Sequence, residues 1–407
     1  MNLLIVEYVS GGGYANQKLS SSTLSEGYGM VRSLISDCKA ADHNVTTLMD
    51  SRLRAFNPPN EADKIVSVSS PYELDKKLKE LSGVADAIYV IAPESGQVLE
   101  KFVETVEASG GTSLNCEVDA IKRVSNKMTV YEAVERIGLK APETVLLDIH
   151  EKTENIERLI KELGYPLVFK PLDGVSCGGL SIVKDGGDIA GAVKKVAQES
   201  ASRQFIAQKR VRGKAASACV ISTEDKALSV SLNRQLVTLA SPDKESGYYG
   251  GVVPFEHPLE RKALRAAERV VEAFSGLKGY VGVDMILTEE EPVMMEVNPR
   301  LTVSYIGLNK AANFNPAEAI VNATIKRKLP KNVQCRSYTF FSKVQVPSRP
   351  QIIAETFKLK DVISPPFPIE RNKTAVALIA ASSSSSGGAQ TAFYRAKKRL
   401  LKLYGDE

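Results

Sequence analysis

The chain has 407 residues, of which 43% are hydrophobic and 25% charged, and its 53 basic and 48 acidic side chains leave a net charge of +5. These are ordinary values for a globular protein, and the length predicts two or three domains. The small net charge argues against a nucleic-acid-binding protein, and no apolar run approaches the length of a bilayer span.

The N-terminal run MNLLIVEYV is short, lacks a positively charged leader and contains Glu7, so we interpret it as a first strand rather than a signal peptide. The five cysteines are an odd number with no C-x-x-C spacing, which favours neither a zinc site nor a disulfide framework. We therefore expect a cytoplasmic protein, with a homodimer as the commonest assembly.

Strands and helices alternate in the first part of the chain, which predicts a parallel sheet in an N-terminal α/β domain over residues 1–118. The expected strands are residues 2–9, 45–48 and 87–91, with a helix at 99–108. Thr23 and Glu26 have the spacing of a capping box at the start of another helix.

A loop rich in glycine and serine, residues 10–22, follows the carboxyl end of the first expected strand. Open α/β sheets bind ligands at such ends, so one interpretation is a substrate loop. The other is a disordered surface connector, and the sequence does not decide between them.

Lys127 precedes an amphipathic helix whose apolar residues keep helical spacing and which ends at Gly138. Further along, Lys170 ends an apolar strand, and a glycine-containing loop follows it. Glycines let backbone N–H groups approach phosphate oxygens, and a lysine adds a mobile positive charge. The loop residues assigned to phosphate are Gly174, Ser176, Gly178 and Gly179.

The run QFIAQKRV, residues 204–211, reads as a strand closed by Gly213. Gln208, Lys209 and the backbone near Val211 are placed to meet the edge of an adenine. Neither a P-loop nor a G-x-G-x-x-G motif occurs, which disfavours the two folds that use them.

Residues 280–287 and 293–297 are expected to form a hairpin around the turn at Glu289–Pro292. Side chains alternate along strands, so Glu296 and Asn298 share a face and Asp284 can pair beside them. Oxygen donors of this kind suit Mg²⁺ or Mn²⁺ when a nucleotide supplies further ligands.

Two arginines are assigned to catalysis beside this hairpin. Arg300 lies two residues beyond Asn298 on the same face, where its guanidinium can hold a phosphate or carboxylate. Arg234, in SLNRQLV, either joins the site or is a solvent-facing strand residue, since the alternation would point Asn233 and Gln235 away from it.

Taken in this order, the motifs resemble the ATP-grasp superfamily from Asp119 to about Lys328. The resemblance implies ATP and a divalent metal as cofactors, with Lys127 and Lys170 on the phosphates and residues 208–211 as the adenine hinge. It also implies Asp284, Glu296 and Asn298 as metal ligands. We expect an α/β, partly α+β, fold with an N-terminal parallel-sheet domain, a small mixed lid and a larger antiparallel-sheet domain.

Within that superfamily the chain is most similar to an archaeal group that includes tyramine–L-glutamate ligases. Six segments carry this likeness: EYVSGGG, LSEGYGM, KPLDGVSCGGL, SLNRQ, YYGGVVPF and MEVNPRLT. The resemblance implies an ADP-forming carboxylate–amine ligase that passes through an acyl phosphate, with a small amino acid such as L-glutamate and an amine such as tyramine as substrates. A carboxylase or kinase of the superfamily, or an ATP-binding protein without turnover, remains an alternative.

The predicted domains after residue 118 are an ATP-grasp domain over residues 119–330, with its lid at about 142–210, and a mainly β extension over 331–407. The extension is longer than the basic pattern needs. Its Ser/Gly run at residues 382–388 is expected to be a flexible connector. The basic residues near the end, 395–402, read as a solvated helix face rather than an RNA-binding tail.

Overall fold

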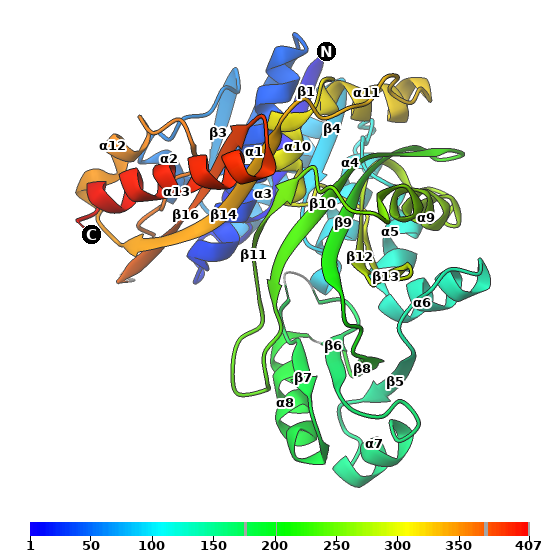
Figure 1. The fold of residues 1–407 in the computed structure, drawn as a ribbon. Helices are drawn as coiled ribbons and strands as arrows, with labels where there is room; N and C mark the ends of the chain where they lie inside the picture. The colour runs from blue at the N-terminus through cyan, green and yellow to red at the C-terminus, as the bar shows by residue number, and fades with distance from the viewer. Residues whose placement is uncertain (175–176, 201, 370–372, 406–407) are drawn as a thin grey trace.

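The computed structural model describes residues 1–174, 177–200, 202–369 and 373–405. It contains three sheets, and Figure 1 shows one of them, the lid, projecting away from the other two. Among the described residues, no helix combines the length and the apolar character that crossing a bilayer requires. The expected fold class, parallel sheet first and antiparallel sheets after it, is confirmed.

The N-terminal sheet is parallel, with strand order β3-β2-β1-β4. Its strands are β1 (Asn2–Glu7), β2 (Asn44–Asp50), β3 (Lys64–Val68) and β4 (Ala87–Ile91). The helices of this region are α1 (Ser21–Ala40), α2 (Ser51–Arg54), α3 (Pro71–Ser82) and α4 (Val98–Ala108). The sequence analysis did not anticipate β3 and α3.

The start of α1 differs from the expected capping box. The helix begins at Ser21 because the side chain of Ser20 accepts a hydrogen bond from the Thr23 N–H, which makes Ser20 the N-cap. Glu26 therefore lies in the second turn of α1, where its side chain does not cap the helix.

Two short helices, α5 (Val118–Ser125) and α6 (Lys127–Arg136), lead from the N-terminal sheet into the lid. The lid is a four-stranded antiparallel sheet in the order β5-β8-β6-β7. Its elements are β5 (Thr144–Asp148), α7 (Thr153–Leu159), β6 (Leu167–Pro171), β7 (Ser181–Val183), α8 (Ile189–Glu199) and β8 (Gln204–Lys209). Its buried apolar side chains form a cluster of their own, so the lid has a separate core.

The largest sheet has eight strands in the order β13-β12-β9-β10-β11-β14-β16-β15. The strands are β9 (Lys214–Thr223), β10 (Ala227–Thr238), β11 (Gly247–Val253), β12 (Lys278–Leu287), β13 (Pro292–Asn298), β14 (Tyr338–Pro347), β15 (Val362–Ser364) and β16 (Thr374–Ser383). The accompanying helices are α9 (Glu260–Glu272), α10 (Ser304–Ala311), α11 (Pro316–Lys326), α12 (Ile353–Thr356) and α13 (Ser386–Leu403).

The C-terminal extension is continuous with this sheet. Strand β14 pairs with β11, and β16 pairs with β14, so residues after 330 widen the same sheet. Figure 1 shows α13 lying along β14 and β16. The expected flexible connector at residues 382–388 is wrong, because it holds the end of β16, the N-cap Ser385 and the first turn of α13.

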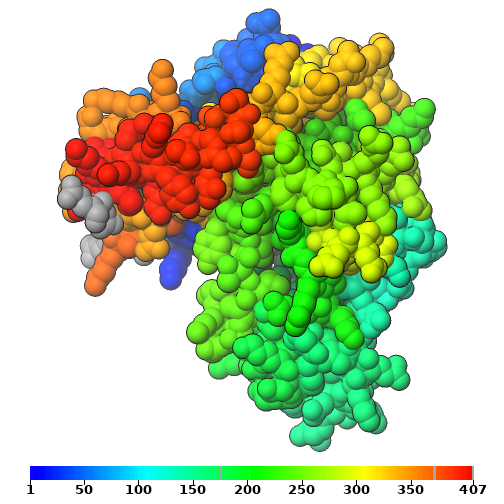
Figure 2. Space-filling model, viewed as in Figure 1, coloured from blue at the N-terminus to red at the C-terminus, as the bar shows by residue number. Residues whose placement is uncertain are grey.

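The N-terminal sheet and the eight-stranded sheet share two hydrophobic clusters. One joins β1 and α4 to β12 and α9, and the other joins α1 to α10, α11 and the opposite face of the large sheet. These two regions therefore form one packed body, from which the lid extends (Figure 2). The junction of lid and body is where the predicted site residues gather.

Candidate active site

The hairpin of β12 and β13 brings the three predicted oxygen donors together. Asp284 lies directly opposite Glu296, and Asn298 lies opposite Gly282. The Asn298 Nδ2 atom donates to Asp284 Oδ2 at 3.2 Å. Gln235, which the sequence analysis did not select, donates from Nε2 to the other Asp284 oxygen at 3.0 Å.

The electrostatics of this hairpin suit a divalent cation. Burial, together with the negative charge of Glu296, raises the pKa of Asp284 to about 7. A cation between the two carboxylates would relieve both effects. Because Asn298 uses its Nδ2 on Asp284, its amide oxygen is left to face a metal.

In the described ranges, no group of three or more His, Cys, Asp or Glu side chains forms a self-sufficient metal cage. Two carboxylates and one amide oxygen leave an octahedral ion short of ligands. Mg²⁺ typically completes its shell with water and substrate phosphates. The donor set therefore fits a cation that arrives with a nucleotide.

Lys170, at the end of β6, is a buried cation. It is 5% exposed, and burial lowers its pKa to about 8, with Lys127 adding to the effect and Glu296 opposing it. Within the described part of the chain, its ammonium makes no hydrogen bond or ion pair. Because an unpaired buried charge is costly, this position favours an anionic ligand.

Lys127, the first residue of α6, joins the lid loop to the hairpin. Its Nζ donates to the carbonyl of Gly174 at 2.8 Å and lies 3.5 Å from Glu296 Oε1. The side chain is 5% exposed, so both predicted phosphate lysines are buried beside the same carboxylate.

The glycine loop after β6 is only partly described. Gly179 has a φ of +71°, and a Cβ there would lie 2.7 Å from Pro171 Cγ, so this position requires glycine. Gly174 and Gly178 also lie in the described part of the loop, whereas Ser176 lies outside the described residues. Cys177 lies in the same loop and lines the acceptor-side cavity described below. Burial raises its thiol pKa to about 12, which argues against a role for Cys177 as a nucleophile.

The predicted adenine hinge supplies an unsatisfied polar atom. Gln208 is 2% exposed and donates from Nε2 to Thr144 Oγ1 at 2.9 Å. Its Oε1 is buried without a hydrogen-bond partner among the described residues. This is expected of an acceptor whose donor is the exocyclic amine of a bound adenine. Lys209 and Val211 line the same cavity, although Lys209 is exposed.

Two adjoining cavities join these groups. The nucleotide-side cavity, of about 150 Å³, is lined by Lys170, Gln208, Val211 and the hairpin carboxylates. The second, the acceptor-side cavity, has about 140 Å³ and is lined by the hairpin residues with Arg300, Glu26 and Tyr248. The two cavities adjoin each other and share six lining residues: Cys177, Leu180, Gln235, Val237, Asp284 and Glu296.

Arg300 faces the acceptor-side cavity and is anchored from the N-terminal region. Its Nε donates to Glu94 Oε2 at 2.9 Å, and its Nη1 donates to the Leu301 carbonyl at 3.1 Å. Glu94 follows β4 and was not selected from the sequence, where no motif marks it. Arg300 is therefore held in position through both Nε and Nη1.

Arg234 is not brought to the site. It is exposed, whereas its neighbours Asn233 and Gln235 point to the other face of β10, where Gln235 contacts Asp284. The solvent-facing interpretation is the one the structure supports, because strand alternation places only one of Arg234 and Gln235 beside the hairpin.

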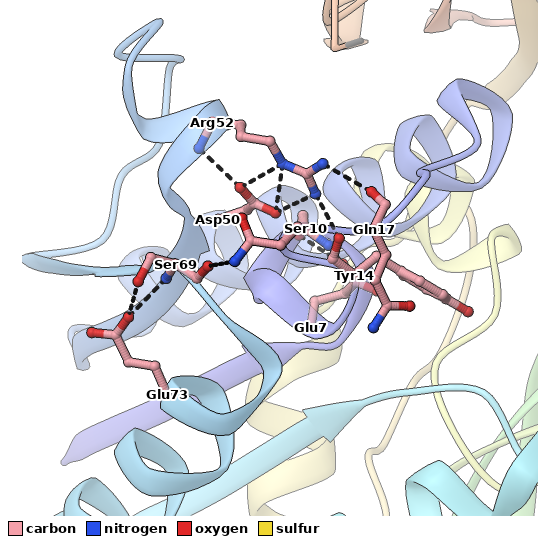
Figure 3. A network of polar contacts seen from close by, with 9 residues as sticks. Glu7, Ser10, Tyr14, Gln17, Asp50, Arg52, Ser69 and Glu73 are labelled. Atoms are coloured by element: carbon pink, nitrogen blue, oxygen red, sulfur yellow. Dashed lines mark hydrogen bonds and ion pairs between the residues drawn. The ribbon is translucent and has the colours of Figure 1, made fainter.

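The loop after β1 is fixed in place, as Figure 3 shows. Arg52 pairs with Asp50 at 2.8 Å and donates to the carbonyls of Tyr14 and Gln17. At the start of the loop, Glu7 accepts hydrogen bonds from the backbone and hydroxyl of Ser10. These contacts contradict the disordered connector, while the substrate-loop interpretation stays a prediction.

Two family models match this chain. One, described as an ATP-grasp domain, matches residues 124–304, and another, described as a pre ATP-grasp 3 domain, matches residues 43–121. The chain belongs to the ATP-grasp superfamily. Within it, the matched range of the first model contains the lid, the hairpin and every residue assigned above to nucleotide or metal.

Two relatives of this ATP-grasp protein are named as tyramine–L-glutamate ligases. The tyramine–L-glutamate ligase of Methanocaldococcus jannaschii is 27% identical over 83% of this chain and 94% of its own length. That of Methanocaldococcus fervens is 26% identical over 83% of this chain and 99% of its own length.

Solved structures confirm the ATP-grasp fold. An ATP-grasp superfamily protein from Archaeoglobus fulgidus aligns with a TM-score of 0.63 and 19% identity over 93% of this chain and 99% of its own. An Aspergillus clavatus N5-carboxyaminoimidazole synthase, solved with ADP and its ribonucleotide, aligns with a TM-score of 0.68 and 17% identity over 100% of this chain and 99% of its own.

Proposed function

We propose that this protein is an ATP-dependent carboxylate–amine ligase that releases ADP and phosphate and forms an amide. The observation that carries the proposal is a pair of adjoining cavities bordered by the Asp284–Glu296–Asn298 cluster, the buried ammonium of Lys170 and the guanidinium of Arg300. L-Glutamate and tyramine are the first substrates to test, because two relatives that align over most of the chain are named for them.

The nucleotide is proposed to occupy the cavity between lid and hairpin. Gln208 would accept a hydrogen bond from the adenine amine, with Lys209 and Val211 lining the rest of the hinge. Lys170, Lys127 and the glycine loop would hold the phosphates. A metal bound by Asp284, Glu296 and Asn298 would neutralise charge on the β- and γ-phosphates.

The reaction is proposed to run in two displacements. A carboxylate oxygen of the first substrate attacks the γ-phosphorus of ATP, and the bond between this phosphorus and the bridging oxygen breaks. The products of this step are ADP and an acyl phosphate. The amine nitrogen then attacks the acyl carbon, inorganic phosphate departs, and the nitrogen loses its proton. Phosphoryl transfer depends mainly on positioning and charge neutralisation, which this arrangement of lysines and Arg300 can supply.

Arg300 is proposed to hold the acyl phosphate. Glu94 and the Leu301 carbonyl hold its guanidinium through Nε and Nη1, and Arg300 lines the acceptor-side cavity next to the hairpin. Such a preorganised donor stabilises charge as it develops. Arg234 has no part in this proposal.

The test is a phosphate-release screen with ATP and Mg²⁺ over amino acids paired with amines, followed by mass spectrometry of the products. We expect phosphate and an amide in equal amounts for at least one pair. A carboxylated or phosphorylated product would replace the proposal with the carboxylase or kinase alternative. If no pair of substrates gave phosphate release, the result would favour an ATP-binding protein without turnover. A homodimer and a cytoplasmic location remain predictions.

A further inference from the structure

Glu26 is a buried carboxylate at the active site that neither the nucleotide nor the metal requires. It is 5% exposed and lines the acceptor-side cavity together with Arg300 and the hairpin donors. Two glycines set the depth of α1 at this point. A Cβ on Gly27 would lie 2.6 Å from Glu7 Oε2, and one on Gly29 would lie 2.8 Å from Leu378 Cδ2. Larger side chains at these two positions would push α1 away, so the glycines allow the close packing in which Glu26 reaches the cavity.

One oxygen of Glu26 is fixed by a lysine from the C-terminal part of the sheet. The Nζ atom of Lys343, on β14, lies 2.7 Å from Glu26 Oε1 and donates to Ser22 Oγ at 2.9 Å. The same atom lies 5.9 Å from the centre of the Tyr248 ring. No hydrogen bond to Glu26 Oε2 exists among the described residues. The second oxygen is therefore available to a ligand in the cavity.

The walls around Glu26 suit a small cation. Tyr248 lines the cavity, and its phenol pKa lies well above the usual value, first through burial and then through the charges of Glu26 and Asp284. Both carboxylates thus act on one aromatic side chain. A carboxylate, an aromatic ring and the hydroxyls of Thr302 and Ser304 together offer what an alkylammonium group needs.

We propose that Glu26 binds the ammonium group of a substrate through Oε2, and that Lys343 is a positioning residue that holds Oε1. This inference rests on the ligase function proposed above. The ammonium can belong to the acceptor amine or to the amino acid, since the recognition chemistry is the same. A purely structural ion pair between α1 and β14 would not need to face the cavity.

The direct test is a binding titration with two matched pairs of probes, in the presence of ADP and Mg²⁺. Tyramine is compared with the alcohol that replaces its amine by a hydroxyl, and L-glutamate is compared with glutarate, which lacks the amine. We expect the wild-type protein to prefer the ammonium-bearing member of one pair by roughly tenfold or more, because a charge-assisted hydrogen bond is lost with the other member.

The variant E26Q should lose that preference, and the pair that changes identifies the source of the ammonium. E355Q is the matched control, because Glu355 also lies 2.7 Å from a lysine, Lys358, but this pair is exposed and lines neither cavity. In turnover assays, E26Q should raise the KM of the same substrate while the KM of ATP changes little. E26D keeps the charge and should restore part of the preference, which covers the case in which E26Q folds poorly.

K343M separates positioning from direct contact. We expect a smaller rise in the same KM than E26Q gives, with the preference for the ammonium-bearing probe retained. Wild-type protein that shows no preference within either pair, or E26Q that keeps the wild-type preference, would overturn the inference. Failure of the ligase proposal is read separately, as ammonium-selective binding without any amide product.

Discussion

The two halves of the active site are assembled in different ways. The metal side is built from two adjacent strands, so Asp284, Glu296 and Asn298 lie within fifteen positions of one another. The acceptor side gathers Glu26, Tyr248 and Lys343 from α1, β11 and β14. In the proposed function, the first half holds the metal and the nucleotide, and the second half selects the substrate. Variants on the metal side should therefore slow ATP cleavage with every substrate, and variants of Glu26 or Lys343 on the acceptor side should change only the affinity for the substrate that carries the ammonium group.

The largest effect is expected for E296Q on the metal side. One charge pair at 4 Å contributes roughly 4 kcal/mol at a surface-like dielectric, which corresponds to about a thousandfold in rate. Phosphate release with ATP and Mg²⁺ measures the loss. Glu289→Gln, in the exposed turn of the same hairpin, is the control and should behave as wild type. E296Q with more than about a tenth of wild-type activity would contradict the metal assignment.

Lys170 gives a second large effect, on nucleotide binding. K170M should weaken ADP binding by about a hundredfold, since a buried ammonium beside phosphate is lost. Burial lowers the lysine pKa to about 8, so the binding form is present below that pH and is lost above it.

Titration calorimetry with ADP and a metal chelator tests this pH dependence. In wild-type protein the affinity for ADP should fall between pH 7 and pH 9, and in K170M it should fall less, because only the titration of Asp284, whose pKa burial raises to about 7, remains. The chelator keeps metal binding to Asp284 out of the measurement. A wild-type affinity that rises with pH would rule out Lys170 as the phosphate cation.

An effect of intermediate size on phosphate release is expected for Gln235 of β10, and almost none for its neighbour Arg234. Q235L removes a hydrogen bond to Asp284 and should lower phosphate release by about tenfold. R234M changes an exposed side chain and should stay within about twofold of wild type. The reverse order would restore Arg234 to the site and contradict the strand orientation described here.

The smallest effect on turnover is expected for D37N, which acts on stability. Asp37 on α1 accepts hydrogen bonds from Tyr305 and Asn309, and burial raises its pKa to about 7. An unfolded aspartate titrates near pH 4, so the contribution of Asp37 to the stability of the wild-type protein falls as the pH rises from about 4 to about 7.

D37N lacks this titration, so its free energy of unfolding relative to wild type should increase between pH 5 and pH 8. Denaturant unfolding at the two pH values measures the difference, with the exposed Asp42→Asn as control. A difference that is the same at both values would show that Asp37 is not perturbed by burial.

The metal side could be predicted from the sequence because its geometry follows from local rules. Strand alternation and one turn are enough to place Asp284 beside Glu296, and the lysine and glycine pattern marks the phosphate loop. The same alternation also identifies Gln235 once the face of β10 is known. That face depends on pairing with β9, which the sequence alone did not specify.

The acceptor side could not be predicted in this way. Glu26 has the sequence spacing of a capping residue, and only the packing of α1 against β1 and β16 turns it toward the cavity. Lys343 reaches the site because the C-terminal strands widen the central sheet instead of forming a separate unit. Glu94 is similar, since its role depends on Arg300, more than two hundred positions away.

An isotope-transfer experiment tests the central claim most directly. The amino acid identified by the substrate screen is labelled with ¹⁸O in its reacting carboxylate and incubated with ATP, Mg²⁺ and the amine. If an acyl phosphate forms beside the hairpin carboxylates, one ¹⁸O atom should appear in the released phosphate for each amide formed. Unlabelled phosphate accompanying labelled amide would contradict the proposed mechanism.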